Sequence, residues 1–260
     1  MTMKVHIIAA GGPLMHTRAD NPELPAAKKL KLNVVSRPED ISDRTSDKLR
    51  IAVAGSHGKT TVAAMIMHVF KHNNIPFDYL ACSATDSDET MAGPGSDSRK
   101  SVTEVDKSLT PPIDPGPEFD FYKPHIAVIN SIESDHLNGF SAFENYREQF
   151  SDFASAIMPG GSLLYYVNDP QAVEIAAHCR DDIRKVPYDV HGYMVNKTGC
   201  YAVTINRMVK VGFPEAHNML YLSAAREVCL SAGLTEDQFY AAIGSFADAS
   251  KNLKNNLLLQ

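Results

Sequence analysis

The chain has 260 residues, of which 44% are hydrophobic and 22% are charged, and its formal net charge is −6. This composition is that of a globular protein with one large or two modest domains, and the negative charge argues against a nucleic-acid-binding protein. No apolar run approaches the roughly 20 residues of a membrane span, and the N-terminus lacks a secretory signal pattern. The four cysteines form no C-x-x-C pair, which argues against a zinc cluster. We therefore expect a cytoplasmic protein that binds neither nucleic acid nor membranes.

The first 48 residues predict short elements rather than a complete nucleotide-binding unit. Residues 4–10 and 32–35 are typical of strands, and residues 22–30 of a short helix. The G-x-G-x-x-G turn of a dinucleotide-binding domain does not occur after the first strand. We therefore expect residues 1–48 to form an abbreviated N-terminal segment.

From residue 49 onward, predicted strands alternate with predicted helices. A strand at 49–54 is followed by a helix from Lys59 whose apolar residues recur at helical spacing on one face: Val62, Met65, Ile66, Val69 and Phe70. The next predicted elements are a short strand at 101–105 within a long loop at 83–123, a strand at 125–129, a helix opened by a capping box from Ser141 to Glu144, a strand at 162–167 and a helix at 170–178. A meander of strands at about 184–212, a buried helix at 215–232 and a helix capped by Thr235 and Gln238 complete the pattern. This order predicts an α/β fold with a doubly wound, mainly parallel sheet and a small antiparallel β meander.

The segment between the strand at 49–54 and the following helix has the residues of a phosphate-binding loop. It reads Gly55-Ser56-His57-Gly58-Lys59-Thr60-Thr61, the short G-x-x-G-K-T form. In such a loop the backbone N–H groups point into one concavity, the helix N-terminus adds partial positive charge, and the lysine faces the β- and γ-phosphates. Thr60 can place its hydroxyl group on Mg²⁺. A glycine-rich turn with a solvated lysine is the alternative, but the flanking strand and amphipathic helix favour phosphate binding.

A second candidate group follows the predicted strand at 125–129. Asp135 and His136 stand after this strand, with Glu133 two residues earlier. A carboxylate and an imidazole at the carboxyl end of a strand beside a phosphate loop can hold a divalent ion. A loop histidine with satisfied hydrogen bonds explains the pair equally well, so the residues alone leave both interpretations open.

A third candidate pair begins the predicted helix at 215–232. The side-chain amide of Asn218, next to His217, offers a donor and an acceptor that suit an adenine edge. Spacing alone favours the simpler interpretation, an N-terminal helix cap.

Together these segments resemble the Mur ligase family, the ATP-dependent amide-forming enzymes of peptidoglycan synthesis. The resemblance lies in residues 53–61, similar to the family's phosphate loop, in residues 130–137, similar to its N-I-x-x-D-H-L segment, and in residues 215–218, similar to its H-N nucleotide-base motif. Residues 20–24, 108–114 and 122–125 are similar to the branch that recycles murein tripeptide, a near relative of the branch that adds L-alanine.

The resemblance implies a reaction in which ATP phosphorylates a carboxylate and an amine attacks the acyl phosphate. The substrates it implies are ATP, UDP-N-acetylmuramate, and either L-alanine or L-alanyl-γ-D-glutamyl-meso-diaminopimelate. It implies Lys59 and His136 as catalytic residues. The Mg²⁺ ligands it implies are Thr60, Glu104, Asp106 and His136, and the nucleotide contacts it implies are Gly55, Ser56, His57, Gly58, Lys59, Thr60, Thr61, His217 and Asn218.

Three positions depart from the family's pattern. Lys107 stands where the family has a metal-binding glutamate, Tyr221 where it has an asparagine, and Asn252 where it has a basic residue. A non-catalytic nucleotide-binding module of the same fold, degenerate, truncated or engineered, is therefore the alternative to an active ligase. A P-loop kinase or GTPase is disfavoured because no guanine-reading N-K-x-D motif occurs.

The resemblance also implies a domain division. We expect residues 1–48 to be an abbreviated, UDP-binding-like segment, residues 49–248 to be the central ATP-binding domain, and residues 249–260 to be a tail where a C-terminal domain would begin. Because ligation needs the nucleotide, the sugar carboxylate and the amine in one site, we expect this polypeptide alone not to complete the full ligation.

Overall fold

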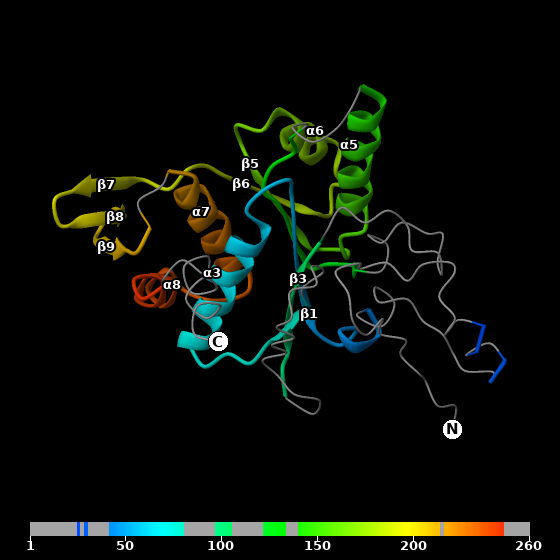
Figure 1. Ribbon diagram of the computed structural model, residues 1–260, viewed down its shortest axis with the longest axis horizontal. Coiled ribbons are helices and arrows are strands. Elements are labelled where there is room, and N and C mark those ends of the chain that lie inside the picture. The colour runs from blue at the N-terminus through cyan, green and yellow to red at the C-terminus, as the bar shows by residue number, and fades with distance from the viewer. Residues whose placement is uncertain are drawn as a thin grey trace.

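Six parallel strands form the main sheet, in the order β2-β3-β1-β4-β5-β6 (Figure 1). The computed structural model describes residues 25–26, 29–30, 42–80, 97–105, 122–133, 140–213 and 216–246. The strands are β1 (Leu49–Ala54), β2 (Asp78–Leu80), β3 (Lys100–Glu104), β4 (Ile126–Ile129), β5 (Ser162–Tyr166) and β6 (Arg184–Tyr188). The predicted doubly wound parallel sheet is confirmed.

Strand β1 lies at the centre of this sheet because its residues are apolar on both faces. Ile51 and Val53 belong to one buried cluster and Ala52 and Ala54 to the other, as the two-residue period of a strand requires. Val53 is paired with Glu104 of β3 on one side and with β4 on the other. The chain thus continues to β2 and β3 on one side of β1 and then to β4 on the other. In such sheets ligands bind outside the carboxyl ends of the strands at this reversal of strand order.

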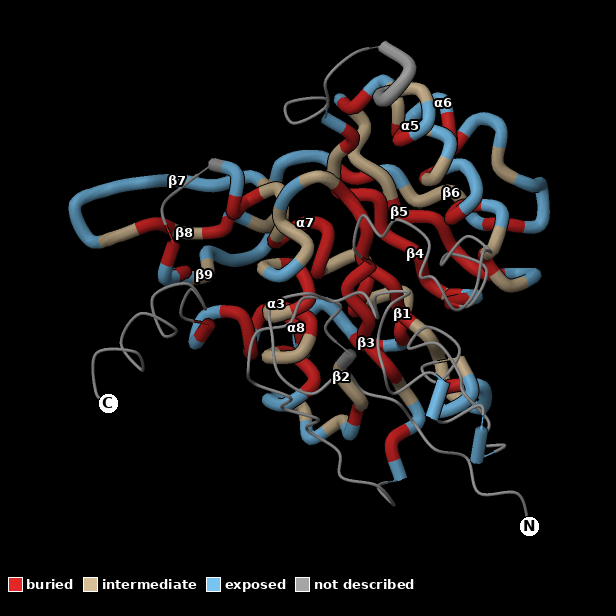
Figure 2. Tube along the Cα trace, turned by 45° about the vertical axis from the view of Figure 1, so that its right-hand side comes forward, coloured by how far each residue is buried: buried red, intermediate tan, exposed pale blue. Residues whose placement is uncertain are grey.

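Helices cover both faces of the sheet (Figure 1). Helices α3 (Lys59–His72), α7 (Ala216–Ser231) and α8 (Glu236–Ile243) pack into one core, and α5 (Phe140–Ser155) and α6 (Pro170–His178) into the other. The five apolar residues predicted on one face of α3 are all fully buried. Figure 2 shows the central strands β1, β3 and β4 mostly buried between these two layers. No helix within the described residues is long and apolar enough to cross a membrane.

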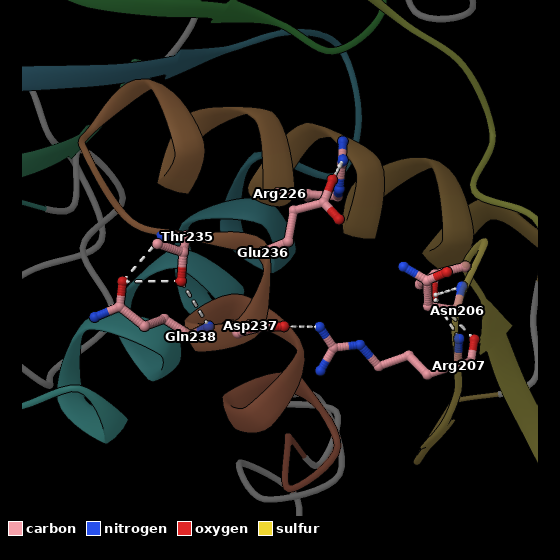
Figure 3. A network of polar contacts seen from close by, with 8 residues as sticks. Asn206, Arg207, Arg226, Thr235, Glu236, Asp237 and Gln238 are labelled. Carbon is pink, nitrogen blue, oxygen red and sulfur yellow. Dashed lines mark hydrogen bonds and ion pairs between the residues drawn. The ribbon is translucent and has the colours of Figure 1, made fainter.

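A separate three-stranded antiparallel sheet lies beside α7 and α8. Its strands are β7 (Tyr193–Asn196), β8 (Gly199–Val203) and β9 (Met208–Val211). Figure 3 shows Arg207, beside this sheet, paired with Asp237 of α8, while Arg226 of α7 pairs with Glu236. The Arg207 guanidinium also lies 5.3 Å from the centre of the Tyr240 ring. The two contacts of Arg207 attach the small sheet, at the residue before β9, to α8.

Two predictions about elements were wrong. Residues 184–188 do not belong to the meander: they form β6, which pairs in parallel with β5 through Leu164 and Val186, because α6 is the crossover between the two strands. Ser141 is not a helix N-cap, since α5 already includes Phe140. The capping box at Thr235 and Gln238 is confirmed, whereas β2 was not predicted.

The N-terminal predictions fall largely outside the described residues. The expected strands at 4–10 and 32–35 lie outside them. Within the expected helix at 22–30, residues 25, 26 and 29 are helical, and the Leu30 amide donates to the Ala26 carbonyl at 3.0 Å.

Candidate nucleotide-binding site

The loop from Gly55 to Gly58 joins the carboxyl end of β1 to the N-terminus of α3. Gly55 has a φ of +141° and Gly58 a φ of +75°, conformations that side chains with a Cβ rarely adopt. Gly58 is the N-cap residue of α3, and its carbonyl accepts the first hydrogen bond of the helix, from the Val62 amide at 2.9 Å. The amide groups before Val62 have no acceptor within the helix. They therefore form the polar end of α3 that a phosphate group would meet.

The segment after β4 fixes the loop from one side. The Ser56 amide donates to the Ser131 carbonyl at 2.7 Å, and the His57 amide donates to Ser131 Oγ at 3.2 Å. Asn130 Nδ2 in turn donates to the His57 carbonyl at 2.7 Å. The expectation that all loop amides converge on one concavity is therefore wrong for Ser56 and His57, because their amides bind Ser131.

Two side chains of the loop, those of Ser56 and His57, make further contacts across the carboxyl edge of the sheet. Ser56 Oγ lies 3.0 Å from the Tyr146 hydroxyl group of α5 and accepts a hydrogen bond from the Glu133 amide at 2.8 Å. His57 Nε2 lies 3.4 Å from Glu133 Oε2, and both side chains are about half exposed. His57 thus contacts a carboxylate at the rim of the loop.

Lys59 carries the positive charge of the loop. Its ammonium group donates to the Gly55 carbonyl at 2.9 Å, so the side chain folds back over the loop that begins four residues earlier. An ionised phosphate oxygen would replace the neutral Gly55 carbonyl as the acceptor of this hydrogen bond, because hydrogen bonds between ionised partners are stronger.

Thr60 and Glu104, two predicted magnesium ligands, are brought together. Thr60 Oγ1 donates to Glu104 Oε2 at 2.7 Å. The other carboxylate oxygen, Oε1, accepts from the Tyr79 hydroxyl group of β2. Glu104 is only 4% exposed. Hydroxyl and carboxylate oxygens are the ligands that Mg²⁺ prefers, so Thr60 and Glu104 fit a magnesium site in residue type and proximity.

The other two predicted magnesium ligands, Asp106 and His136, lie outside the described residues, as do Asp135 and Lys107. Within the described part of the chain, no group of three or more His, Cys, Asp or Glu side chains is arranged to hold a metal ion. The prediction for Asp106 and His136 therefore stays a prediction.

A buried polar framework supports the segment after β4. The Tyr188 hydroxyl group donates to the Ile129 carbonyl and to Asn130 Oδ1, at 3.2 and 3.1 Å. Burial raises the pKa of Tyr188, so the hydroxyl keeps its proton and acts as a donor. Asp169 Oδ2 accepts from the Ile132 amide at 2.7 Å, while Oδ1 caps α6. This framework holds the residues that bind the loop.

His217 and Asn218 lie in the first turn of α7, which begins at Ala216. The alternative of a helix cap is therefore wrong, since both residues are inside the helix. Asn218 is 4% exposed and His217 is exposed. The His217 ring packs edge-on against Tyr221, with ring centres 5.7 Å apart. Tyr221 in turn lies against the loop, because a Cβ at Gly58 would be 2.3 Å from its ring.

Sequence reasoning missed Tyr146, which reaches the loop, and Tyr79 and Asp169, which hold Glu104 and the segment after β4. It singled out residues 130–137 but not the contacts of Asn130 and Ser131 with the loop. Asn130 and Ser131 directly follow a predicted strand, which is a signal for a role at the sheet edge. No local pattern marks Tyr79 or Tyr146, since each reaches the site through tertiary packing.

Comparison with known proteins identifies relatives of this chain. The model of the Mur ligase middle domain matches residues 53–208. UDP-N-acetylmuramate–L-alanine ligase of Streptomyces griseus is 29% identical over 256 residues, which cover 91% of this chain and 52% of that protein. The corresponding ligase of Arthrobacter sp. is 29% identical over 251 residues, covering 91% of this chain and 51% of the relative. The chain thus spans about half the length of these relatives.

Solved structures of similar fold are also ligases by name. The UDP-N-acetylmuramate:L-alanyl-γ-D-glutamyl-meso-diaminopimelate ligase of Neisseria meningitides has a TM-score of 0.71 and 21% identity, over 88% of this chain and 76% of that one. UDP-N-acetylmuramate–alanine ligase MurC of Thermotoga maritima has a TM-score of 0.61 and 22% identity, over 88% of this chain and 53% of that one. At these identities the likeness establishes the fold.

Proposed function

Because the chain belongs to the Mur ligase family through its middle domain, we propose that residues 49–248 bind ATP with Mg²⁺ for an ATP-dependent, amide-bond-forming ligase of peptidoglycan synthesis or recycling. One observation carries this proposal: the glycine loop 55–58 lies between a buried central strand and the N-terminus of α3, with Lys59 above it and the Thr60–Glu104 pair beside it. Such an arrangement is typical of a site that binds a phosphate chain.

Each residue then has a distinct role. The amides of the first turn of α3, which have no acceptor within the helix, and the ammonium group of Lys59 bind the phosphate oxygens and neutralise part of their charge. Thr60 and Glu104, with Asp106 and His136, would hold Mg²⁺, which when bound supplies further charge neutralisation on the phosphates. His217 and Asn218, at the start of α7, would contact the nucleotide base.

The substrates follow from the same family membership. We propose UDP-N-acetylmuramate as the carboxylate substrate, because both curated relatives reported above carry it in their names. The amine would come from L-alanine or from L-alanyl-γ-D-glutamyl-meso-diaminopimelate. The carboxylate would take the γ-phosphoryl group of ATP, releasing ADP, and the amine would then displace phosphate from the acyl phosphate to form the amide.

The test is ADP release by the purified chain with ATP and Mg²⁺, with and without UDP-N-acetylmuramate and each amine. We expect the muramyl substrate to stimulate ADP release, and Lys59→Ala to abolish the stimulation. ATP binding without any stimulation would favour the alternative, a non-catalytic nucleotide-binding module. Mass spectrometry of the same mixtures shows whether a UDP-muramyl amide is formed.

A further inference from the structure

We propose that Tyr221 is a nucleotide-binding residue of this site: its ring forms the α7 side of the phosphate loop, and its hydroxyl group donates a hydrogen bond to a phosphate oxygen of the bound nucleotide. The inference rests on the proposed function, because it assigns a new contact within the same nucleotide site.

The first support is the close approach of Tyr221 to the loop. A Cβ built on Gly58 would lie 2.3 Å from Tyr221 Cε1 and 2.4 Å from Tyr221 Cζ. Real side chains do not approach so closely, so the ring occupies the space beside Gly58 that any other residue there would need. Cζ is the ring carbon that bears the hydroxyl group. The hydroxyl group therefore lies at the loop itself, next to the N-terminus of α3.

The second support is the position of Tyr221 between the two parts of the proposed site. Its ring lies beside Gly58, the N-cap residue of α3. One helical turn earlier in α7 lies His217, whose ring packs edge-on against that of Tyr221. Helices α3 and α7 pack side by side, as Figure 1 shows. A nucleotide that extends from the phosphate loop towards His217 and Asn218 therefore passes Tyr221.

The third support is the hydrogen-bonding state of the hydroxyl group. Within the described part of the chain, the Tyr221 hydroxyl group has no hydrogen-bond partner, whereas the buried Tyr188 hydroxyl group has two. A phenol at the mouth of a phosphate loop without a protein acceptor has its donor available for a ligand oxygen. Burial, and the negative charge of Glu133, raise the pKa of Tyr221. The group is therefore a protonated donor at neutral pH.

The experiment compares Tyr221→Phe, which removes only the hydroxyl group, with the wild-type chain. Tyr193→Phe, on the exposed β7, is the matched control. Affinities for Mg–ATP and Mg–ADP are measured by calorimetry, and affinity for adenosine by ligand-observed NMR. We expect Tyr221→Phe to weaken ATP and ADP binding by about 10-fold to 150-fold, the effect of one lost hydrogen bond to a charged oxygen, and to leave adenosine binding unchanged. Tyr193→Phe should bind all three ligands as the wild type does.

Two results would overturn the assignment. If Tyr221→Phe binds ATP as tightly as the wild type does, the hydroxyl group does not contact the nucleotide. If Tyr221→Phe loses as much affinity for adenosine as for ATP, the contact lies away from the phosphates. Both results leave the proposed function intact, since the wild type binds ATP in each. Failure of the wild type itself to bind ATP would instead contradict the proposed function. Thermal unfolding without ligand, expected to be the same for both variants and the wild type, separates loss of binding from loss of fold.

Discussion

The hydroxyl group of Thr60 donates a hydrogen bond to the carboxylate of Glu104 across 2.7 Å, linking the first turn of α3 to the last residue of β3. The other oxygen of Glu104 accepts from Tyr79 of β2. A nearly buried carboxylate is thus held by two neutral donors from two neighbouring elements. The arrangement keeps a negative charge beside the phosphate loop, where a divalent cation would be stabilised.

Tyr79→Phe removes one of the two hydroxyl donors to Glu104. A buried charged acceptor that loses a partner is destabilised, so we expect the free energy of unfolding to fall by about 1–3 kcal/mol. Urea unfolding monitored by circular dichroism measures the change. Tyr193→Phe, on an exposed strand, should change stability by less than about 0.5 kcal/mol. Equal unfolding midpoints for the two variants would mean that the Tyr79 contact does not hold Glu104.

Asp169→Ala should be more damaging than the loss of an ordinary helix cap. Its carboxylate accepts from the Gln171 and Ala172 amides at 2.9 and 3.1 Å, and from the buried Ile132 amide at 2.7 Å. Removing it uncaps α6 and leaves the Ile132 amide unpaired, so we expect a loss of roughly 2–4 kcal/mol of stability.

The matched control for Asp169 is Thr235→Ala. Thr235 caps α8 by accepting from the Gln238 amide, but at an exposed site. We expect this substitution to cost about 1 kcal/mol. Equal losses in chemical unfolding of the two variants would show that Asp169 acts only as a cap and not as support for the segment after β4.

His191 should make stability depend on pH. Nδ1 lies 2.7 Å from the Gly192 carbonyl, which only accepts, so Nδ1 carries the hydrogen and Nε2 accepts from the Tyr240 hydroxyl group at 2.6 Å. Burial lowers the pKa of His191 below its ordinary value of 6.5, and the hydrogen bond to Gly192 opposes that shift only in part. The folded protein therefore favours the neutral ring.

The sign of the pH effect follows from that lowered pKa. In the unfolded chain His191 takes up a proton near pH 6.5, whereas in the folded protein it does so at lower pH. The stability that the neutral ring contributes is thus present above about pH 6.5 and is lost as pH falls through the folded-state pKa. Denaturant unfolding of wild type and His191→Gln between pH 5 and 8, values bracketing the ordinary histidine pKa of about 6.5, measures this. A difference between the two that is constant over this range would contradict the prediction.

The fold was predictable where local pattern and tertiary packing agree. The buried strand at 49–54, the glycine loop and the apolar face of α3 each follow from spacing over a few residues, and the structure has all three. β2 was missed because three residues, Asp78–Leu80, carry no periodicity. Residues 184–188 were placed in the wrong sheet because sequence pattern does not distinguish an edge strand of a parallel sheet, here with Pro187, from a meander strand.

The contacts around the loop were less predictable than the loop itself. Tyr146 is 90 positions from Ser56 and Tyr79 is 25 positions from Glu104. Such contacts depend on how helices and strands pack, and a single tyrosine has no local signature. Tyr221 was recognised only as a departure from a family pattern. Its contact with Gly58 follows from the packing of α7 against α3.

Calorimetric titration of Mg–ATP into the wild-type chain and into Lys59→Ala tests the central claim most directly, with Lys71→Ala, near the far end of α3, as the control. We expect the wild type and Lys71→Ala to bind alike. We expect Lys59→Ala to bind about 10-fold to 150-fold more weakly, because one charged hydrogen bond to phosphate, worth about 1.5–3 kcal/mol, is lost. Equal affinity of Lys59→Ala and the wild type, or no binding by the wild type, would contradict the assignment of residues 55–61 as a phosphate-binding loop.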